Sequence, residues 1–168
     1  GVQGHVAYPH LSNNPINTLI DICKTLKKIK LDKGNKNFQP SNLEFTTINV
    51  DNKAHNIIPS KAKTQFNIRY NNIHTAFSLK KKINSKIKTL CKKNKCIYKI
   101  EYIANGDAFL TKPDKIIYMA KKIIKKITKI NPKFSTTGGT SDARFIRKIS
   151  PCLEFGLVNK TMHKVDEC

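Results

Sequence analysis

Apolar side chains recur every three or four positions in three stretches of the chain, and this spacing predicts amphipathic helices. The first helix is predicted over residues 15–30, with Asn13 or Asn14 as the N-cap and Pro15 in the first turn. The second helix carries the apolar stripe Leu79, Ile83, Ile87 and Leu90. The third is predicted over residues 114–130.

Other stretches alternate between apolar and polar positions, as half-buried strands do. Along residues 62–70, the side chains that face one way are Phe66, Ile68 and Tyr70, and those that face the other way are Gln65, Asn67 and Arg69. Residues 43–50 alternate in the same manner, and residues 2–8 and 96–103 are predicted as two further strands. The order strand, helix, strand, strand, helix, strand predicts a ferredoxin-like βαββαβ fold, with both helices on one face of a four-stranded antiparallel sheet.

The remaining residues have a different organisation. After a linker at residues 105–113 and the third helix come a Gly-rich turn, a short helix near 143–149, a buried strand at 153–155 and a final loop. An order of helix, strand, helix, strand and loop is typical of the end of an α/β domain.

We therefore expect two domains, a ferredoxin-like α+β domain over residues 1–110 and the C-terminal part of an α/β domain over residues 111–168. The chain begins with Gly1 instead of Met, and it stops at Cys168 without a polar tail. Both ends lead us to expect a piece of a longer protein.

The chain is strongly basic, since 32 Lys and Arg residues against 11 Asp and Glu residues give a net charge of +21 at pH 7. Such a charge attracts phosphate backbones, so a basic nucleic-acid-binding module is one interpretation. The interpretation we favour is a compositional bias toward Lys, Ile and Asn that spreads lysines over every solvated face. Lysines lie on all three predicted helices, and the chain has no Trp and no paired-cysteine finger, so we expect no nucleic-acid partner.

Cysteine usage and hydropathy point to an intracellular protein. The five cysteines are unevenly spaced, which does not suit a disulfide framework. No window of about 18 uninterrupted apolar residues is present, and the start of the chain lacks the pattern of a signal peptide. We expect reduced thiols, no membrane partner and a cytoplasmic location.

Residues that carry chemistry occur in two places in the second predicted domain. The run of hydroxyl and turn residues at 136–142 could hold an anion on its backbone N–H groups, or could simply cap the short helix that follows. His163 lies in the loop after the buried strand, where open α/β sheets place their ligands, although a loop histidine is commonly a surface residue.

Two further candidates lie in the first predicted domain. His5 lies within the opening strand close to Tyr8 and His10, where it could be functional or structural. Arg69 alternates with apolar residues on a strand of a Lys-rich chain. Its fork-shaped guanidinium suits a carboxylate, and the alternative is an exposed arginine on the face of the sheet.

Five motifs then follow one another in an order and spacing that resemble a known family. They are Gly4-His5-Val6-Ala7-Tyr8-Pro9-His10, Asn56-Ile57-Ile58-Pro59, Gln65-Phe66-Asn67-Ile68-Arg69-Tyr70, Ser135-Thr136-Thr137-Gly138-Gly139-Thr140-Ser141-Asp142-Ala143-Arg144-Phe145 and Asn159-Lys160-Thr161-Met162-His163-Lys164-Val165-Asp166-Glu167. Together they resemble the C-terminal half of the desuccinylases for succinyl-diaminopimelate, a branch of the dizinc aminoacylase/carboxypeptidase-type metallohydrolases. Ala143 stands where this family has Gly, a small change.

The resemblance implies a fold, a reaction and a cofactor. The ferredoxin-like part would be a lid that also forms a homodimer, and the α/β part would be the end of the zinc-binding catalytic domain. The reaction would be hydrolysis of N-succinyl-L,L-2,6-diaminopimelate to succinate and L,L-diaminopimelate, a step of lysine and diaminopimelate biosynthesis in bacteria. Two Zn²⁺ ions per subunit, with Co²⁺ able to substitute, would activate a bridging water, and a Glu would take its proton.

The resemblance also implies roles for single residues. His163 would be a zinc ligand, His5 would enter the active site of the partner subunit and stabilise the oxyanion, and Arg69 would bind a substrate carboxylate. The remaining substrate-binding positions would be Tyr8, Asn56, Gly139, Thr140 and Asn159.

The half of the family that supplies the Glu base and the other zinc ligands is not part of this sequence. One His does not hold two zinc ions, so we expect this chain by itself to be inactive and to bind zinc weakly. Besides the nucleic-acid-binding module, the sequence leaves open a related N-acyl amino acid deacylase such as an acetylornithine deacetylase.

Overall fold

The computed structural model describes residues 1–137, 141–156, 161 and 163–166. The chain has a mixed α+β fold that divides into two compact units, Gly1–Ala108 and Phe109–Cys168. The first unit contains β1 (Gly4–His5), the 3₁₀ helix η1 (Pro9–Leu11), α1 (Pro15–Lys27), β2 (Asn42–Asn49), β3 (Ile57–Ile58), β4 (Lys63–Arg69) and α2 (Ala76–Lys93). The second contains α3 (Lys115–Thr128) and α4 (Ala143–Ile146).

The helices of the first unit begin at side-chain caps. The Asn14 side chain accepts a hydrogen bond from the backbone N–H of Ile16, with Pro15 in the first turn of α1. Thr75 and Ser78 form a reciprocal capping box at the start of α2, with two hydrogen bonds of 3.1 Å between the side chain of each residue and the backbone N–H of the other. These caps satisfy backbone donors that a helix start otherwise leaves open.

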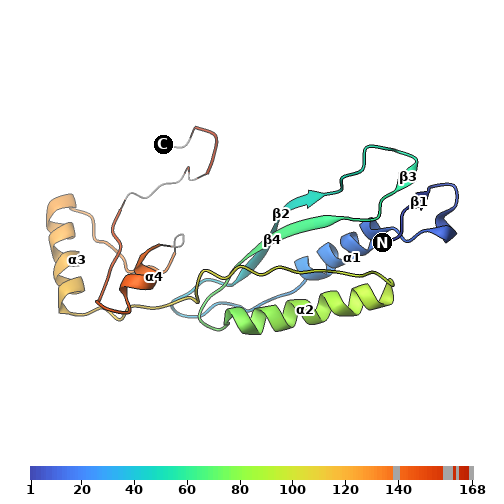
Figure 1. The fold of residues 1–168 in the computed structure, drawn as a ribbon. Helices are drawn as coiled ribbons and strands as arrows, with labels where there is room; N and C mark the ends of the chain where they lie inside the picture. Colours follow the sequence, from blue (N-terminus) through green and yellow to red (C-terminus); the bar gives the residue numbers. More distant parts are fainter. Residues whose placement is uncertain (138–140, 157–160, 162, 167–168) are drawn as a thin grey trace. The chain divides into compact units, whose positions relative to one another are not determined.

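The hydrophobic core lies between the two helices and the antiparallel pair β2–β4. Leu26 of α1 and Ile83 of α2 are 0% exposed, and further buried members of this core cluster are Ile22, Leu43, Ile87 and Cys91. Phe45 and Phe66, which face each other across the strand pair, pack against this cluster with their ring centroids 5.7 Å apart. Figure 1 shows α1 and α2 side by side on one side of the β2–β4 pair.

The sheet differs from the predicted four-stranded ferredoxin-like sheet. The described residues form two separate two-stranded sheets, β1 with β3 and β2 with β4. The predicted strand 2–8 shortens to β1, because the chain turns where the backbone N–H of Tyr8 bonds to the carbonyl of His5 at 3.0 Å and Pro9 then begins η1. The prediction of an opening strand in the main sheet is therefore wrong for the described structure.

The predicted strand 96–103 is not assigned as a strand either. Its side chains nevertheless alternate as those of a strand do. Tyr98 and Ile100 pack against the core, and Ile97 between Cys96 and Tyr98 is 97% exposed. Alternation determines which side chains are buried, whereas a strand also needs a neighbour to exchange backbone hydrogen bonds, and the described residues provide none here.

The second unit is dominated by α3. The Asp114 side chain accepts from the backbone N–H of Ile117 at 2.9 Å, and the helix ends where Lys129 takes the left-handed conformation at φ 60°. The only side chain of α3 that is buried in the described structure is Ile117, whereas Ile127 on the apolar stripe is 75% exposed. The strand predicted at 153–155 lies among described residues and is not formed there. None of the described helices is long and apolar enough to cross a membrane.

A buried carboxylate ties the loops at one end of the first unit together. The Asp32 side chain is 6% exposed and accepts hydrogen bonds from the N–H of Gly34 at 2.6 Å and from the side-chain amide of Asn71 at 2.8 Å. It also accepts from the N–H of Ser41, and His74 Nε2 lies 3.2 Å from its Oδ2. Burial by itself raises the pKa of Asp32, but the hydrogen bonds favour the charged form and hold that pKa well below its usual range.

Shortening the side chain at the centre of the core tests the packing. Ile83→Ala removes a side chain that is 0% exposed, so we expect the free energy of unfolding to fall by about 3–4 kcal/mol. The matched control Ile97→Ala removes the same atoms from a position that is 97% exposed, and should change that free energy by less than about 0.5 kcal/mol. Urea denaturation followed by circular dichroism measures both, and equal losses would contradict the proposed core.

The Asp32 network predicts acid sensitivity of the fold. Since the folded carboxylate has a lowered pKa, its stabilising contribution is present at neutral pH and is lost as the pH falls below about 4, where the unfolded chain takes up a proton first. Asp32→Asn should lower the free energy of unfolding at pH 7 by about 1–3 kcal/mol and flatten its dependence on acid pH. The exposed control Asp51→Asn should do neither. Urea denaturation at several pH values tests this, and an unchanged acid dependence in Asp32→Asn would refute it.

Candidate functional site

Two of the sequence motifs meet in one small projection of the first unit, which we call the β1–β3 arm and define as residues 4–11 together with 56–58. His5 pairs with Ile57 across the antiparallel ribbon, and the backbone N–H of Val6 donates to the carbonyl of Asn56 at 3.1 Å. Tyr8 follows in the same turn, with its ring centroid 5.9 Å from that of His5. The structure thus brings together His5, Tyr8 and Asn56, three candidates of which the first and the last are 51 positions apart in sequence.

The imidazole of His5 is held by its own turn. The backbone N–H of Ala7 donates to His5 Nδ1 at 3.1 Å, so Nδ1 carries the lone pair and the proton of the neutral ring resides on Nε2. The His5 residue is exposed at the surface of the arm. In the neutral ring, Nε2–H is then available as a hydrogen-bond donor on an exposed residue.

Arg69 lies away from this arm, although it belongs to the same unit. It is the last residue of β4 and pairs with Asn42, whereas the connection from β3 enters β4 at Lys63. A strand rises about 3.3 Å per residue, so the six steps from Lys63 to Arg69 cover roughly 20 Å. The structure therefore places the exposed Arg69 at one end of the strand pair and the arm beyond the other end (Figure 1).

The remaining candidates belong to the second unit. Gly139, Thr140 and Asn159 lie outside the described residues. His163 is described, is exposed, and has a left-handed backbone at φ 60°. Among the described residues, no group of three or more His, Cys, Asp or Glu side chains is arranged to hold a metal ion.

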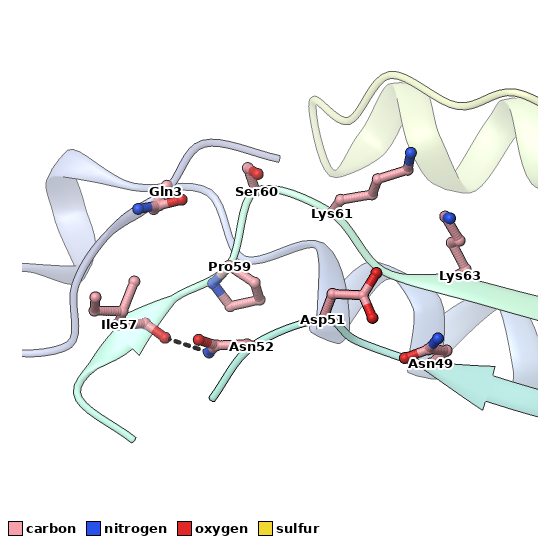
Figure 2. A pocket seen from close by; sticks show the side chains of 9 residues that line it. All are labelled: Gln3, Asn49, Asp51, Asn52, Ile57, Pro59, Ser60, Lys61 and Lys63. Carbon is pink, nitrogen blue, oxygen red and sulfur yellow. Dashed lines mark hydrogen bonds between the residues drawn. The ribbon is translucent and has the colours of Figure 1, made fainter. Parts of the chain in front are cut away.

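A shallow polar pocket lies beside the arm and was not anticipated from the sequence. Figure 2 shows its lining, which consists of Gln3, Asn49, Asp51, Asn52, Ile57, Pro59, Ser60, Lys61 and Lys63 around a cavity of about 260 Å³. The Asn52 side chain donates to the carbonyl of Ile57 at 2.8 Å and so fixes one wall to β3. None of the predicted site residues lines this pocket, so it is not part of the candidate site.

The face of the β2–β4 pair that points away from the core tests the alternative of a nucleic-acid-binding module. Phe45 and Phe66 pack against the core. The outer face instead presents Glu44, Gln65 and Asn67 beside Arg69. A sheet that binds single-stranded RNA uses exposed aromatic rings on which bases stack, and this face lacks them in the described structure.

The geometry of His5 predicts its tautomer. In ¹⁵N NMR spectra of histidine-labelled protein above pH 8, His5 should be found mainly with the proton on Nε2, because Ala7 N–H occupies Nδ1. His10 of the same arm has no such backbone donor among the described contacts and serves as the control for an unbiased tautomer mixture. A His5 spectrum with the proton on Nδ1 would contradict the turn.

The chain is similar in sequence to known proteins and matches one family model. The model of the peptidase dimerisation domain matches residues 1–95. Over 167 residues, the chain is 62% identical to succinyl-diaminopimelate desuccinylase of Pelagibacter ubique. The aligned region covers 99% of the chain and 44% of that protein. The corresponding enzymes of Rickettsia bellii and Parvibaculum lavamentivorans are 49% and 45% identical, again over 99% of the chain.

These relatives confirm the predicted resemblance. The chain spans less than half the length of the curated relatives that it matches, since it covers between 42% and 44% of those three proteins. The family match includes β1, the arm, both helices of the first unit and the strand pair β2–β4. On this evidence, the chain belongs to the M20 peptidase dimerisation domain family.

Proposed function

We propose that this chain is the C-terminal part of a hydrolase that cleaves N-succinyl-L,L-2,6-diaminopimelate to succinate and L,L-diaminopimelate. The observation that carries the proposal is the 62% identity over 99% of the chain with a protein named for this reaction. The reaction belongs to lysine and diaminopimelate biosynthesis, which fits the cytoplasmic location expected from the sequence.

His5 is proposed to stabilise the anionic oxygen that forms when the amide carbonyl is attacked. Such a role needs a donor that is already oriented before the reaction begins. The Ala7 N–H bond to Nδ1 supports this assignment, because it leaves the proton of the neutral ring on Nε2 of an exposed residue. Tyr8 and Asn56 of the same arm are proposed to bind the substrate beside it.

Arg69 is proposed to bind a substrate carboxylate, for which a guanidinium offers two parallel N–H donors. Because about 20 Å of strand separate Arg69 from the arm, one substrate molecule does not reach both within the same chain. We therefore propose a homodimer in which the arm of one subunit serves the active site of the other, while Arg69 serves its own. A dimerisation domain over residues 1–95 supports this arrangement.

Residues 1–110 are proposed to form the lid, in a variant of the ferredoxin-like arrangement whose opening strand β1 lies outside the main sheet, and residues 111–168 the end of the catalytic domain. The packing of Tyr98 and Ile100 on the same core as β2 and β4 supports the lid, because it places the segment 96–103 against the core that the two strands share.

The described residues of this chain do not form a zinc site by themselves. The described part of the chain gathers no three metal-binding side chains, and His163 is a single candidate ligand. Two Zn²⁺ ions per subunit, or Co²⁺ in their place, are therefore proposed only for the longer protein, whose remaining part would supply the other ligands and the Glu base. Gly139, Thr140 and Asn159 are proposed to complete the substrate site there.

The proposal predicts the behaviour of the longer protein that contains this chain. It should release succinate from N-succinyl-L,L-2,6-diaminopimelate when loaded with zinc, and His5→Ala should lower kcat by about 100- to 1,000-fold, because the oxyanion loses its donor. His10→Ala, a second histidine of the same arm, is the matched control and should leave kcat within about twofold of the parent. His163→Ala should lower zinc binding as well as turnover.

Two results would overturn the proposal. Rapid hydrolysis of N-acetylornithine without hydrolysis of the succinyl substrate would identify a related deacylase. Equal activity of His5→Ala and His10→Ala would show that His5 has no role in the reaction.

Mixing His5→Ala subunits with Arg69→Ala subunits tests the dimer, because hybrid dimers should regain part of the lost activity in one of their two sites.

A further inference from the structure

Three segments of the first unit meet at the end of β4, directly after Arg69. The hydroxyl of Tyr70 lies 2.9 Å from Asp107 Oδ1 and 3.1 Å from the carbonyl oxygen of Gly106, and it donates to them. Asp107 Oδ1 also accepts the backbone N–H of Ala76, the first residue of α2, at 2.9 Å. We call these contacts the Asp107 corner. It joins the end of β4, the start of α2 and the segment that leads out of the unit.

The electrostatics of the corner favour a carboxylate at this position. Ala76 N–H is one of the donors that a helix leaves open at its start, and the Thr75–Ser78 capping box satisfies other groups. A negative charge at the start of a helix also interacts favourably with the helix dipole. Burial, together with the hydrogen bond and the charge of Asp107, raises the pKa of Tyr70 to about 12, so its hydroxyl remains a donor at neutral pH.

The backbone at Gly106 is adapted to this corner. Its φ of +113° lies in a region that side chains with a Cβ rarely adopt, and this conformation sets the direction of the carbonyl that Tyr70 binds. The first compact unit ends at Ala108, so Gly106 and Asp107 are among its last residues. The corner thus lies where the chain leaves the first unit.

The residues after Arg69 are held on both sides. Asn71, which is 3% exposed, donates to Asp32 Oδ1 at 2.8 Å and to the carbonyl of Gln39 at 3.0 Å. Tyr70 lies between Asn71 and Arg69. The described hydrogen bonds of its hydroxyl all go to the Asp107 corner. Loss of the corner would therefore remove one of the contacts that hold the chain directly after Arg69, beside the pairing of Arg69 with Asn42 and the Asn71 hydrogen bonds.

We propose that Asp107 is a positioning residue that, through Tyr70 and Ala76, holds Arg69 and the outgoing chain in a fixed relation to the body of the unit. Asp107 does not touch the substrate in this proposal. The part of the proposal that concerns catalysis rests on the function proposed above for Arg69, whereas the structural part does not.

Hydrogen exchange followed by mass spectrometry on the longer protein tests the structural part. In Asp107→Ala, peptides that cover residues 71–79 and 104–108 should exchange about tenfold faster, because Ala76 N–H and the outgoing chain lose their shared partner. Tyr70→Phe should accelerate residues 104–108 and leave Ala76 less affected. Asp107→Asn keeps an acceptor oxygen and should restore most of the protection.

Two variants of the same kind nearby serve as matched controls. Glu101→Ala removes a carboxylate from an exposed ion pair with Lys99, and Tyr98→Phe removes a hydroxyl that donates to Asn84 at 3.1 Å. Neither should alter exchange at residues 71–79 or 104–108. If Asp107→Ala and Glu101→Ala exchange alike, the corner does not hold these segments and the proposal is overturned.

The kinetics of the same variants separate this proposal from the proposed function. Asp107→Ala and Tyr70→Phe should raise KM for the succinyl substrate about five- to tenfold with kcat within about twofold, since Arg69 binds a carboxylate that does not react. Asp107→Asn should recover most of the KM. Faster exchange with an unchanged KM would overturn the positioning role. A parent protein without desuccinylase activity but with the predicted exchange pattern would overturn the proposed function and leave the structural part supported.

Discussion

The packing of two helices on one face of the β2–β4 pair is the constraint on which the first unit depends. Leu26 and Ile83 are its most deeply buried side chains, and the inward-facing phenylalanines of the two strands complete the same cluster. Because this single core orients α1, α2 and both strands, it also determines where the ends of β4 lie. The positions of the arm and of Arg69 follow from it.

Polar contacts then fix the loops that the core leaves free. Asp32 binds the loop after α1 to the turn after β4, and Asp107 binds the outgoing chain to the start of α2. Both carboxylates act on the same few residues beyond Arg69. In a chain with a net charge of +21, two of the 11 acidic residues thus gather at one end of one strand.

The proposed site is incomplete within this chain. The arm offers an oriented donor on His5, and β4 offers Arg69, but about 20 Å of strand lie between them. The described residues contain no cluster of metal ligands. The proposed division of the site between two subunits, and between this chain and the rest of a longer protein, would explain both features and agrees with the match to a dimerisation domain.

The sequence by itself determined the α-helices and the strands β2 and β4, because helical and strand periodicity are local properties of the chain. It also determined the family, because the five motifs and their order can be read directly from the sequence. It did not determine which strands pair. Alternation in residues 2–8 and 96–103 reports a buried face but not the hydrogen-bonding neighbour, and β1 finds its partner in β3, about fifty residues away. The joining of His5 to Asn56, the distance of both from Arg69, and the meeting of Tyr70 with Asp107 were decided by the tertiary structure alone, since each depends on contacts between segments that are distant in the chain.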